Sequence, residues 1–434
     1  MNTAVGASLG TGVTTADPPV GNGGRRIRSM GVQLLCTSGW VLWSYLRLRP
    51  PASVTSTHPP LAGYGAWAYS HFSYSDLLSL YRAHHLANHA FPYVHTVIEY
   101  PVLTGLFMWC AAWMPGVGGY LLASCIGLLG CALGSVVFLR RISPRCAWVF
   151  ALSPLLLVYS LLNWDLIAIF FMLAGWDYFR RRRYGWSGVL LSLGVCSKFF
   201  PLILLVFCVV ACFADRDDRV ARRGAAVMVA TATLTALILN LPFALANFAG
   251  WADFFSFNAT RGADVGLLFE LHLVSAWPIA LVDAVSALLV LAAIVVLALW
   301  VLRGVPVATA AAAALAFMML MNKVFSPQYM LWVFVFGLLA GWPGWTLASV
   351  TAAGLADYAN AMITLHFVSI HARVFAWYFR TVFPLNRALR MVAVACGLLA
   401  SIWETWRDPT GSWHRLRKRL ALPLEPEPMS ELVG

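Results

Sequence analysis

The run WPIALVDAVSALLVLAAIVVLALWVL, residues 277–302, is apolar over more than the ~20 residues that a straight transmembrane helix needs. Further apolar runs follow one another along the 434-residue chain. Hydrophobic residues make up 60% of the sequence and charged residues 11%, whereas about 25% of a soluble domain is charged. The 19 tryptophans and 14 tyrosines suit the aromatic belts at the two surfaces of a bilayer. The sequence therefore predicts an all-α polytopic integral membrane protein.

The positions of the basic residues indicate how the chain crosses the membrane. The formal net charge is +12, which in a soluble protein would suggest a nucleic-acid partner. Here arginine clusters such as 180–183 lie between apolar runs, as expected for cytoplasmic loops under the positive-inside rule. Arg47 and Arg49, at the outer end of the first run, are exceptions that either snorkel or face an anionic lipid. The topology has about twelve transmembrane helices with both termini cytoplasmic, and the expected spans are 30–48, 117–139, 146–162, 165–179, 185–199, 201–214, 223–242, 277–302, 306–322, 328–341, 345–366 and 386–405.

Between two tails, these spans form one membrane domain, residues 30–405. Residues 1–29 are rich in Gly, Thr, Ala and Pro and are predicted to be a disordered cytoplasmic tail, and residues 406–434 a basic cytoplasmic tail. Two large loops are expected outside, a first one over 50–116 and a second over 243–276. The short apolar stretch 101–115 is interpreted as a membrane-dipping part of the first loop.

The first outer loop holds a polar, histidine-rich interval that includes Asp76, His84 and Glu99. Only 18 of the 434 residues are acidic, and ionisable groups at a membrane site usually mark function. The spacing predicts an interfacial helix over 73–88, in which Ser73 and Asp76 form a capping box. For Asp76 the structural alternative to a catalytic role is a helix cap.

Other polar residues converge on the same predicted face, among them Asp165, Lys198, Arg261 and Lys323. A channel would need polar residues through the whole membrane depth. A transporter would favour inverted repeats, and no convincing repeat is present. An enzyme acting at the outer surface fits best, and the alternatives from other classes are a proton-coupled transporter or lipid flippase and a structural assembly protein.

Five short motifs occur in order along the chain: Tyr74-Ser75-Asp76, Phe91-Pro92-Tyr93, Glu99-Tyr100-Pro101-Val102-Leu103, Ser197-Lys198-Phe199-Phe200-Pro201 and Ser326-Pro327-Gln328-Tyr329. Together they resemble glycosyltransferase family 87, over about residues 30–405. Members of this family are polyprenol-phosphate-mannose-dependent mannosyltransferases of actinobacteria with the GT-C fold. The resemblance implies transfer of mannose from a polyprenyl-phosphate donor to a hydroxyl group outside the cell, with inversion at the anomeric carbon. Another donor sugar, such as arabinofuranose or another hexose, is the alternative within the same fold.

The resemblance also implies roles for individual residues. A general base raises the rate of attack by a hydroxyl group about 10²–10⁴-fold, and the acidic residue of the first outer loop, Asp76, occupies the position of that base. A cation or hydrogen-bond donor must meet the departing phosphate. The expected assignments are Glu99, Asp165 and Tyr74 for acceptor contact or loop support, Lys198, Lys323, Arg261, Arg82, His84 and His85 for the donor phosphate, and Gln328 and Tyr329 for the substrate pocket.

Several of these residues have structural alternatives. Asp165 begins a helix, where an acid favours the dipole. Gln328 and Tyr329 could serve only to satisfy backbone groups beside Pro327. His85 and His89 have the spacing of metal ligands on a helix, but the glutamate of a zinc-protease motif is absent, so zinc hydrolysis and a metal site are not expected there. No cofactor is expected, with a divalent cation as the alternative.

The expected partners are the lipid-linked donor, an extracytoplasmic glycolipid, glycan or other acceptor, and membrane lipids, without nucleic acid. The expected location is the plasma membrane.

Overall fold

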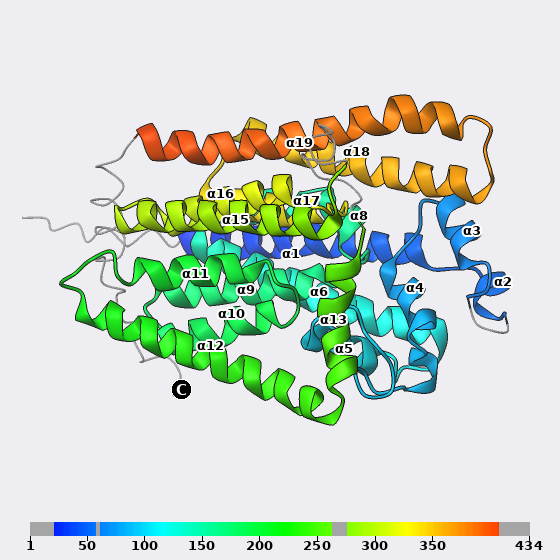
Figure 1. The fold of residues 1–434 in the computed structure, drawn as a ribbon, viewed down its shortest axis with the longest axis horizontal. Coiled ribbons are helices and arrows are strands. Elements are labelled where there is room, and N and C mark those ends of the chain that lie inside the picture. Colours follow the sequence, from blue (N-terminus) through cyan, green and yellow to red (C-terminus); the bar gives the residue numbers. More distant parts are fainter. Residues whose placement is uncertain (1–20, 58–60, 263–275, 408–434) are drawn as a thin grey trace, which may run out of the picture.

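The computed structural model describes residues 21–57, 61–262 and 276–407, and within these ranges the chain is helical apart from its loops and one isolated bridge between Pro92 and Thr96. The longer helices run side by side along the long axis of the molecule (Figure 1). The all-α fold class is thus confirmed. The elements are α1 (Gly21–Leu48), α2 (Ala52–Thr55), α3 (Tyr64–Ser70), α4 (Asp76–Ala83), η1 (Leu86–Asn88), α5 (Val102–Ala111), α6 (Gly116–Ile142), α7 (Pro144–Ala151), α8 (Leu155–Tyr159), α9 (Asp165–Arg180), α10 (Tyr184–Val195), α11 (Pro201–Ala211), α12 (Arg219–Ala246), α13 (Phe248–Thr260), α15 (Ile279–Leu302), α16 (Val307–Met321), α17 (Tyr329–Ala340), α18 (Gly344–Ser369) and α19 (Phe375–Arg407).

Four helices in the described part of the chain are long and apolar enough to cross a membrane: α6, α12, α15 and residues Phe375–Trp403 of α19. The most apolar window of α15 is only 17% buried inside the protein, and that of α12 only 22%. An apolar surface of this size requires an apolar surrounding. The chain is therefore a polytopic membrane protein, in which shorter apolar helices such as α10, α11, α16 and α17 pack between the long ones.

Three predicted boundaries were wrong. The span expected at 146–162 is two helices, α7 and α8, because Pro154 lacks an N–H and disfavours helical backbone at Ser153. The last span begins at Phe375, and α1 begins at Gly21, so part of the expected N-terminal tail is helical. Residues 1–20 and 408–434 lie outside the described residues, and the count of twelve spans stays a prediction.

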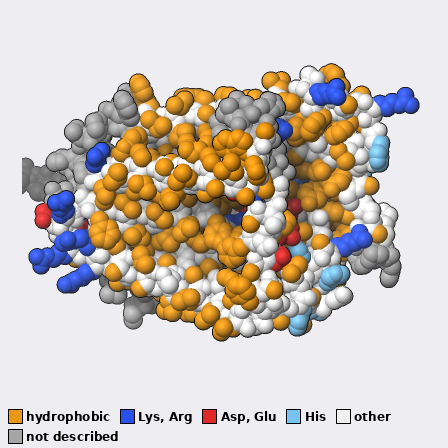
Figure 2. Space-filling model, in the orientation of Figure 1, with side chains coloured by type: hydrophobic (Ala, Val, Ile, Leu, Met, Phe, Trp, Pro, Cys, Tyr) orange, Lys and Arg blue, Asp and Glu red, His pale blue; other side chains and the backbone are white. Residues whose placement is uncertain are grey.

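Charged side chains gather toward the two ends of the bundle (Figure 2). Several lysine and arginine side chains project from the end where the turns α9–α10 and α11–α12 lie, and others project from the opposite end, where the visible histidines lie. Two arginines of the α9–α10 turn are paired, with Arg181 Nε 3.0 Å from Asp177 and Arg182 Nη2 2.8 Å from Asp218. Arginine clusters at these two turns, at 180–183 and 216–223, as the positive-inside rule describes for cytoplasmic loops, and the orientation in the membrane stays a prediction.

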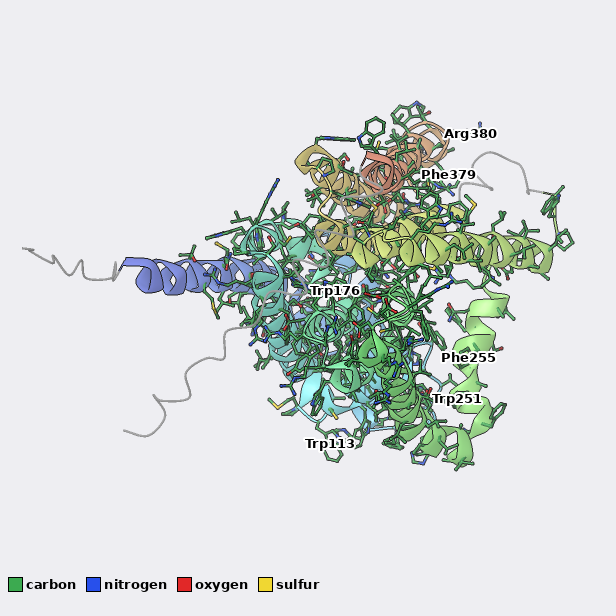
Figure 3. The ribbon with its side chains drawn as sticks, turned by 90° about the vertical axis from the view of Figure 1, so that its left-hand side faces the viewer. Trp113, Trp176, Trp251, Phe255, Phe379 and Arg380 are labelled. Atoms are coloured by element: carbon green, nitrogen blue, oxygen red, sulfur yellow. The ribbon has the colours of Figure 1, made fainter. Side chains whose placement is uncertain are left out.

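The first outer loop forms a small helical layer at the histidine-rich end, built from α2 to α5 (Figure 1). Near this end α13 crosses the direction of the bundle instead of following it. Large aromatic side chains lie on several sides of the bundle: Trp113 and Trp251 in the lower part of Figure 3, and Phe379 of α19 at the top. Trp113 and Phe379 are well exposed, as aromatic residues facing lipid would be.

Candidate active site

The polar site begins at the N-terminus of α4. Ser75 is the N-cap residue, and its hydroxyl accepts from the N–H of Leu77, so the predicted capping box from Ser73 was wrong. The Ser75 hydroxyl also donates to the carbonyl of Leu161, and the N–H of Asp76 donates to the carbonyl of Leu162 at 2.9 Å. These bonds fasten the start of α4 to the junction between α8 and α9, which lies more than eighty residues away in sequence.

The carboxylate of Asp76 is held by the side chain of Asn163 in this junction. The Asn163 amide donates to Asp76 Oδ2 at 2.7 Å and to the hydroxyl of Tyr100 at 2.8 Å. Its own oxygen accepts from the N–H of Trp164 at 2.7 Å, which fixes the orientation of the amide. Asn163 is fully buried, whereas Asp76 is partly accessible. A rigid amide therefore presents one carboxylate at the edge of a buried polar cluster.

The surroundings of Asp76 act in opposite directions on its basicity. Burial raises the pKa of the Asp76 carboxyl, and hydrogen bonds from Tyr74 and Asn163 and the charge of Lys198 lower it, with a net rise above its ordinary value. A raised pKa makes the carboxylate a stronger base. The arrangement suits a group that must accept a proton from a substrate, because such a base works best with a pKa closer to neutrality.

A buried ion pair lies next to this carboxylate. Lys198, in the turn between α10 and α11, has its Nζ 3.4 Å from Asp165 Oδ1 and 4.3 Å from the centre of the Tyr100 ring. The N-terminus of α5 positions the turn, since the Thr104 hydroxyl donates to the carbonyl of Ser197 at 2.8 Å. Three segments of the chain thus bring Asp76, Asp165 and Lys198 into one polar cluster.

The remaining polar residues of the first loop do not join this cluster. Glu99 faces His84, with 3.3 Å between Oε2 and Nε2, so it supports the loop and does not contact Asp76. Arg82 is exposed and donates to the carbonyl of Leu61, and His85 is exposed in a left-handed backbone conformation. The interfacial helix predicted over 73–88 begins at Asp76 and ends at Ala83, so His85 lies beyond it, directly before η1.

The second half of the chain borders the site through the start of α17. Tyr329 stacks on Trp332 at 4.0 Å, and Trp332 stacks on Phe200 at 4.4 Å, two residues after Lys198. Through Phe200 this aromatic stack adjoins the turn that carries Lys198. Gln328 precedes it and is almost buried.

Lys323 is already paired, because its Nζ lies 2.8 Å from Asp283 of α15 and donates to the carbonyl of Ala259 in α13. It therefore ties three elements together: α13, α15 and the α16–α17 loop. A phosphate at Lys323 would have to share this ammonium with Asp283.

Sequence reasoning missed two central residues, Asn163 and Tyr100. Neither Asn163 nor Tyr100 is ionised near neutral pH, so the distribution of charge in the sequence does not reveal them. Two sequence patterns point to these residues. Tyr100 directly follows Glu99 and precedes a proline, and Asn163 lies two residues before Asp165.

The site residues lie largely within a segment that matches a known family. Residues 98–327, more than half of the chain, match the family model of glycosyltransferase family 87. The chain belongs to this family. It is accordingly a glycosyltransferase of the membrane. The match contains Tyr100, Asn163, Asp165 and Lys198, and it begins after Asp76. No curated protein and no solved structure matches the chain.

Proposed function

We propose that this glycosyltransferase moves a sugar from a polyprenyl-phosphate donor to a hydroxyl group at the extracytoplasmic surface of the plasma membrane, with Asp76 as the general base. The observation that carries the proposal is the Asp76 carboxylate, held at 2.7 Å by the buried amide of Asn163 and left partly accessible. Mannose is the sugar that the family resemblance favours.

The reaction follows from the chemistry of this carboxylate. Asp76 accepts the proton of the acceptor hydroxyl as its oxygen forms a bond to the anomeric carbon. The bond from that carbon to the phosphate oxygen breaks, and the polyprenyl phosphate leaves with the electron pair. A single displacement of this kind inverts the anomeric centre. The protonated Asp76 then releases its proton to solvent through its accessible side.

The phosphate places a second demand on the site. Negative charge grows on the leaving group, so positive charge or hydrogen-bond donors must face it. Lys198 contributes to the local potential, but Asp165 already neutralises its ammonium group at 3.4 Å. With Asp76 ionised, these three residues together carry a net negative charge. The donor phosphate therefore needs positive charge from a further residue, and Arg261, at the C-terminus of α13, is one candidate.

The test is transfer by the purified protein in detergent, with radiolabelled polyprenyl-phosphate mannose and a membrane extract as acceptor. Wild type moves label into product, and Asp76→Asn lowers the rate by about 10²–10⁴-fold, the usual contribution of a general base. Asp217→Asn is the matched control, because Asp217 is exposed in the α11–α12 turn at the opposite end of the bundle. Equal transfer by wild type and Asp76→Asn would remove Asp76 from the role of base. Transfer only from a different lipid-linked sugar would change the donor and keep the reaction.

A further inference from the structure

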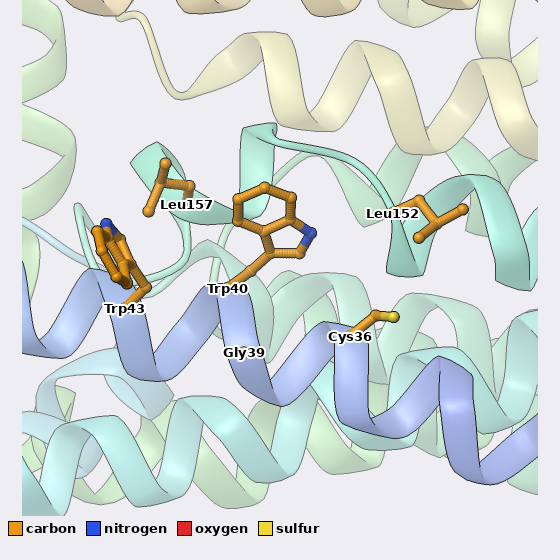
Figure 4. Close-up of a pocket in the computed structure, with 6 residues that line it drawn as sticks. All are labelled: Cys36, Gly39, Trp40, Trp43, Leu152 and Leu157. Atoms are coloured by element: carbon orange, nitrogen blue, oxygen red, sulfur yellow. The ribbon is translucent and has the colours of Figure 1, made fainter.

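An apolar groove runs along one side of α1 (Figure 4). Its volume is about 600 Å³. Trp40 and Trp43 of α1 form one wall, and Leu152 and Leu157, on either side of the break between α7 and α8, form the other. Cys36 and Gly39 complete the lining. Because α1 is expected to cross the membrane, a groove of this composition is suited to a hydrocarbon chain.

The groove has a cation at one end. Cys36, Trp40, Trp43 and Arg47 are separated by four, three and four residues, so they lie on one face of α1. Arg47 follows Trp43 by one turn, about 6 Å along the helix axis. The lining of the groove is therefore continued on the same helix face by a guanidinium group in the last turn of α1.

The guanidinium group of Arg47 has donors to spare. Its Nη1 donates to the carbonyl of Phe72 and to the hydroxyl of Tyr358 in α18. Its Nε and Nη2 are buried and have no hydrogen-bond partner among the residues that the structure describes. A buried donor without a partner costs free energy, and the cost is larger when the group is charged. An anion placed there would satisfy both donors, and arginine matches the oxygens of a phosphate well.

The Arg47 end of the groove adjoins the candidate active site. Phe72, which Arg47 contacts, lies four residues before Asp76. Tyr358, the other partner of Arg47, donates to the carbonyl of Phe72 at 2.6 Å, and the hydroxyl of Tyr64 accepts from the N–H of Ser75, next to Asp76, at 2.9 Å. On the opposite wall, Leu157 belongs to α8, whose continuation carries Asn163.

We propose that this groove binds the polyprenyl phosphate, with its phosphate on Arg47 and its first isoprene units along Trp40, Trp43, Leu152 and Leu157. The inference rests on the proposed function and adds the lipid site to it. An apolar channel ending in a single cation complements a long hydrocarbon chain that carries one phosphate. The occupant is the lipid-linked substrate and not a bilayer phospholipid, because the cationic end of the groove reaches the loop that carries Asp76.

The test measures binding of radiolabelled polyprenyl phosphate, without sugar or acceptor, to the purified full-length protein in detergent. Arg47→Gln weakens binding about ten- to hundredfold, as expected for loss of hydrogen bonds to a charged group. Arg49→Gln is the matched control, since Arg49 is exposed and lies just beyond Leu48, the last residue of α1. Arg47→Lys keeps the charge and is expected to retain part of the affinity.

A second pair of variants probes the groove without touching Arg47. Leu157→Trp fills the space beside Trp40 and weakens binding, whereas Leu42→Trp, on an exposed part of α1 away from the groove, leaves it unchanged. Wild-type affinity in folded Arg47→Gln and in Leu157→Trp would overturn the proposal. If phosphatidic acid displaced the labelled lipid as well as unlabelled polyprenyl phosphate does, the proposal would also be overturned, since the groove would then bind phospholipids in general.

Binding of polyprenyl phosphate and transfer of sugar are tested independently of each other. Asp76→Asn is expected to bind polyprenyl phosphate as wild type does while failing to transfer sugar. Lipid binding without transfer from any donor would therefore count against the proposed function and not against the groove.

Discussion

Replacing Asn163 with leucine tests whether this buried amide sets the basicity of Asp76. The substitution removes a donor that lies 2.7 Å from the carboxylate and puts a larger apolar side chain of the same branched shape in a fully buried position. A hydrogen bond to a charged group contributes about 1.5–3 kcal/mol. At about 1.4 kcal/mol per pKa unit, its loss raises the pKa of Asp76 by about one to two units.

Asn163→Leu makes sugar transfer more sensitive to acid. Burial already raises the pKa of Asp76, and loss of the Asn163 donor raises it further. The base must be ionised to accept a proton, so activity is lost as the pH falls through this pKa. The acid limb of the kcat/KM profile therefore moves to higher pH by about one to two units, and the rate at higher pH falls less than the rate at lower pH.

The assay is kcat/KM for sugar transfer across the acid and neutral range, together with thermal unfolding in detergent. Asn258→Leu is the control, because Asn258 is exposed on α13 and bonds only within its own helix, to the carbonyl of Phe254 at 2.7 Å. Tyr100→Phe keeps the ring beneath Lys198 and loses a hydroxyl 3.5 Å from Asp76, so its shift is smaller. An unmoved acid limb in folded Asn163→Leu would refute the assignment.

Lys198→Met leaves the buried carboxylate of Asp165 without its ion-pair partner and lowers the free energy of unfolding, measured by denaturation in detergent, by about 3–5 kcal/mol. The double variant with Asp165→Leu recovers most of the loss. Equal stability of wild type and both variants would contradict the pairing. Gly250→Ala places a Cβ 2.1 Å from the carbonyl oxygen of Tyr93 and destabilises the packing of α13 on the first loop by about 1–3 kcal/mol. The expected result is a lower unfolding temperature. An unchanged unfolding temperature would show that α13 shifts without cost. Arg82→Ala changes transfer by less than about threefold, because an exposed side chain away from special features contributes little; a loss comparable to that of Asp76→Asn would instead place this arginine on the substrate.

The ion pairs of Lys198 and Lys323 show what charge in the sequence leaves undecided about the site. Sequence reasoning gave Lys198 and Lys323 the same role, because both precede a proline and both were expected at the outer face. In the folded chain Lys198 reaches Asp165 beside Asp76, whereas Lys323 reaches Asp283, an aspartate of a predicted span that the sequence did not single out. The partner of a lysine depends on which helices lie side by side, and this is a property of tertiary packing.

The sequence by itself determined the fold class, the membrane location and the identity of Asp76 as the leading candidate. Apolar runs of spanning length need no tertiary information, since the bilayer imposes helical structure on any segment that crosses it. A rare acidic residue in a mostly apolar chain is also visible without a structure.

Only the tertiary structure decided which neighbours act on that residue. The bond from Asn163 to Asp76 spans 87 positions, and the contact of Arg47 with Tyr358 spans 311. No local sequence pattern predicts such pairs, because residues this far apart in sequence meet only when whole helices pack together. The break at Pro154 has a local cause, but its consequence, a groove between α1 and the α7–α8 junction, exists only once those helices pack together.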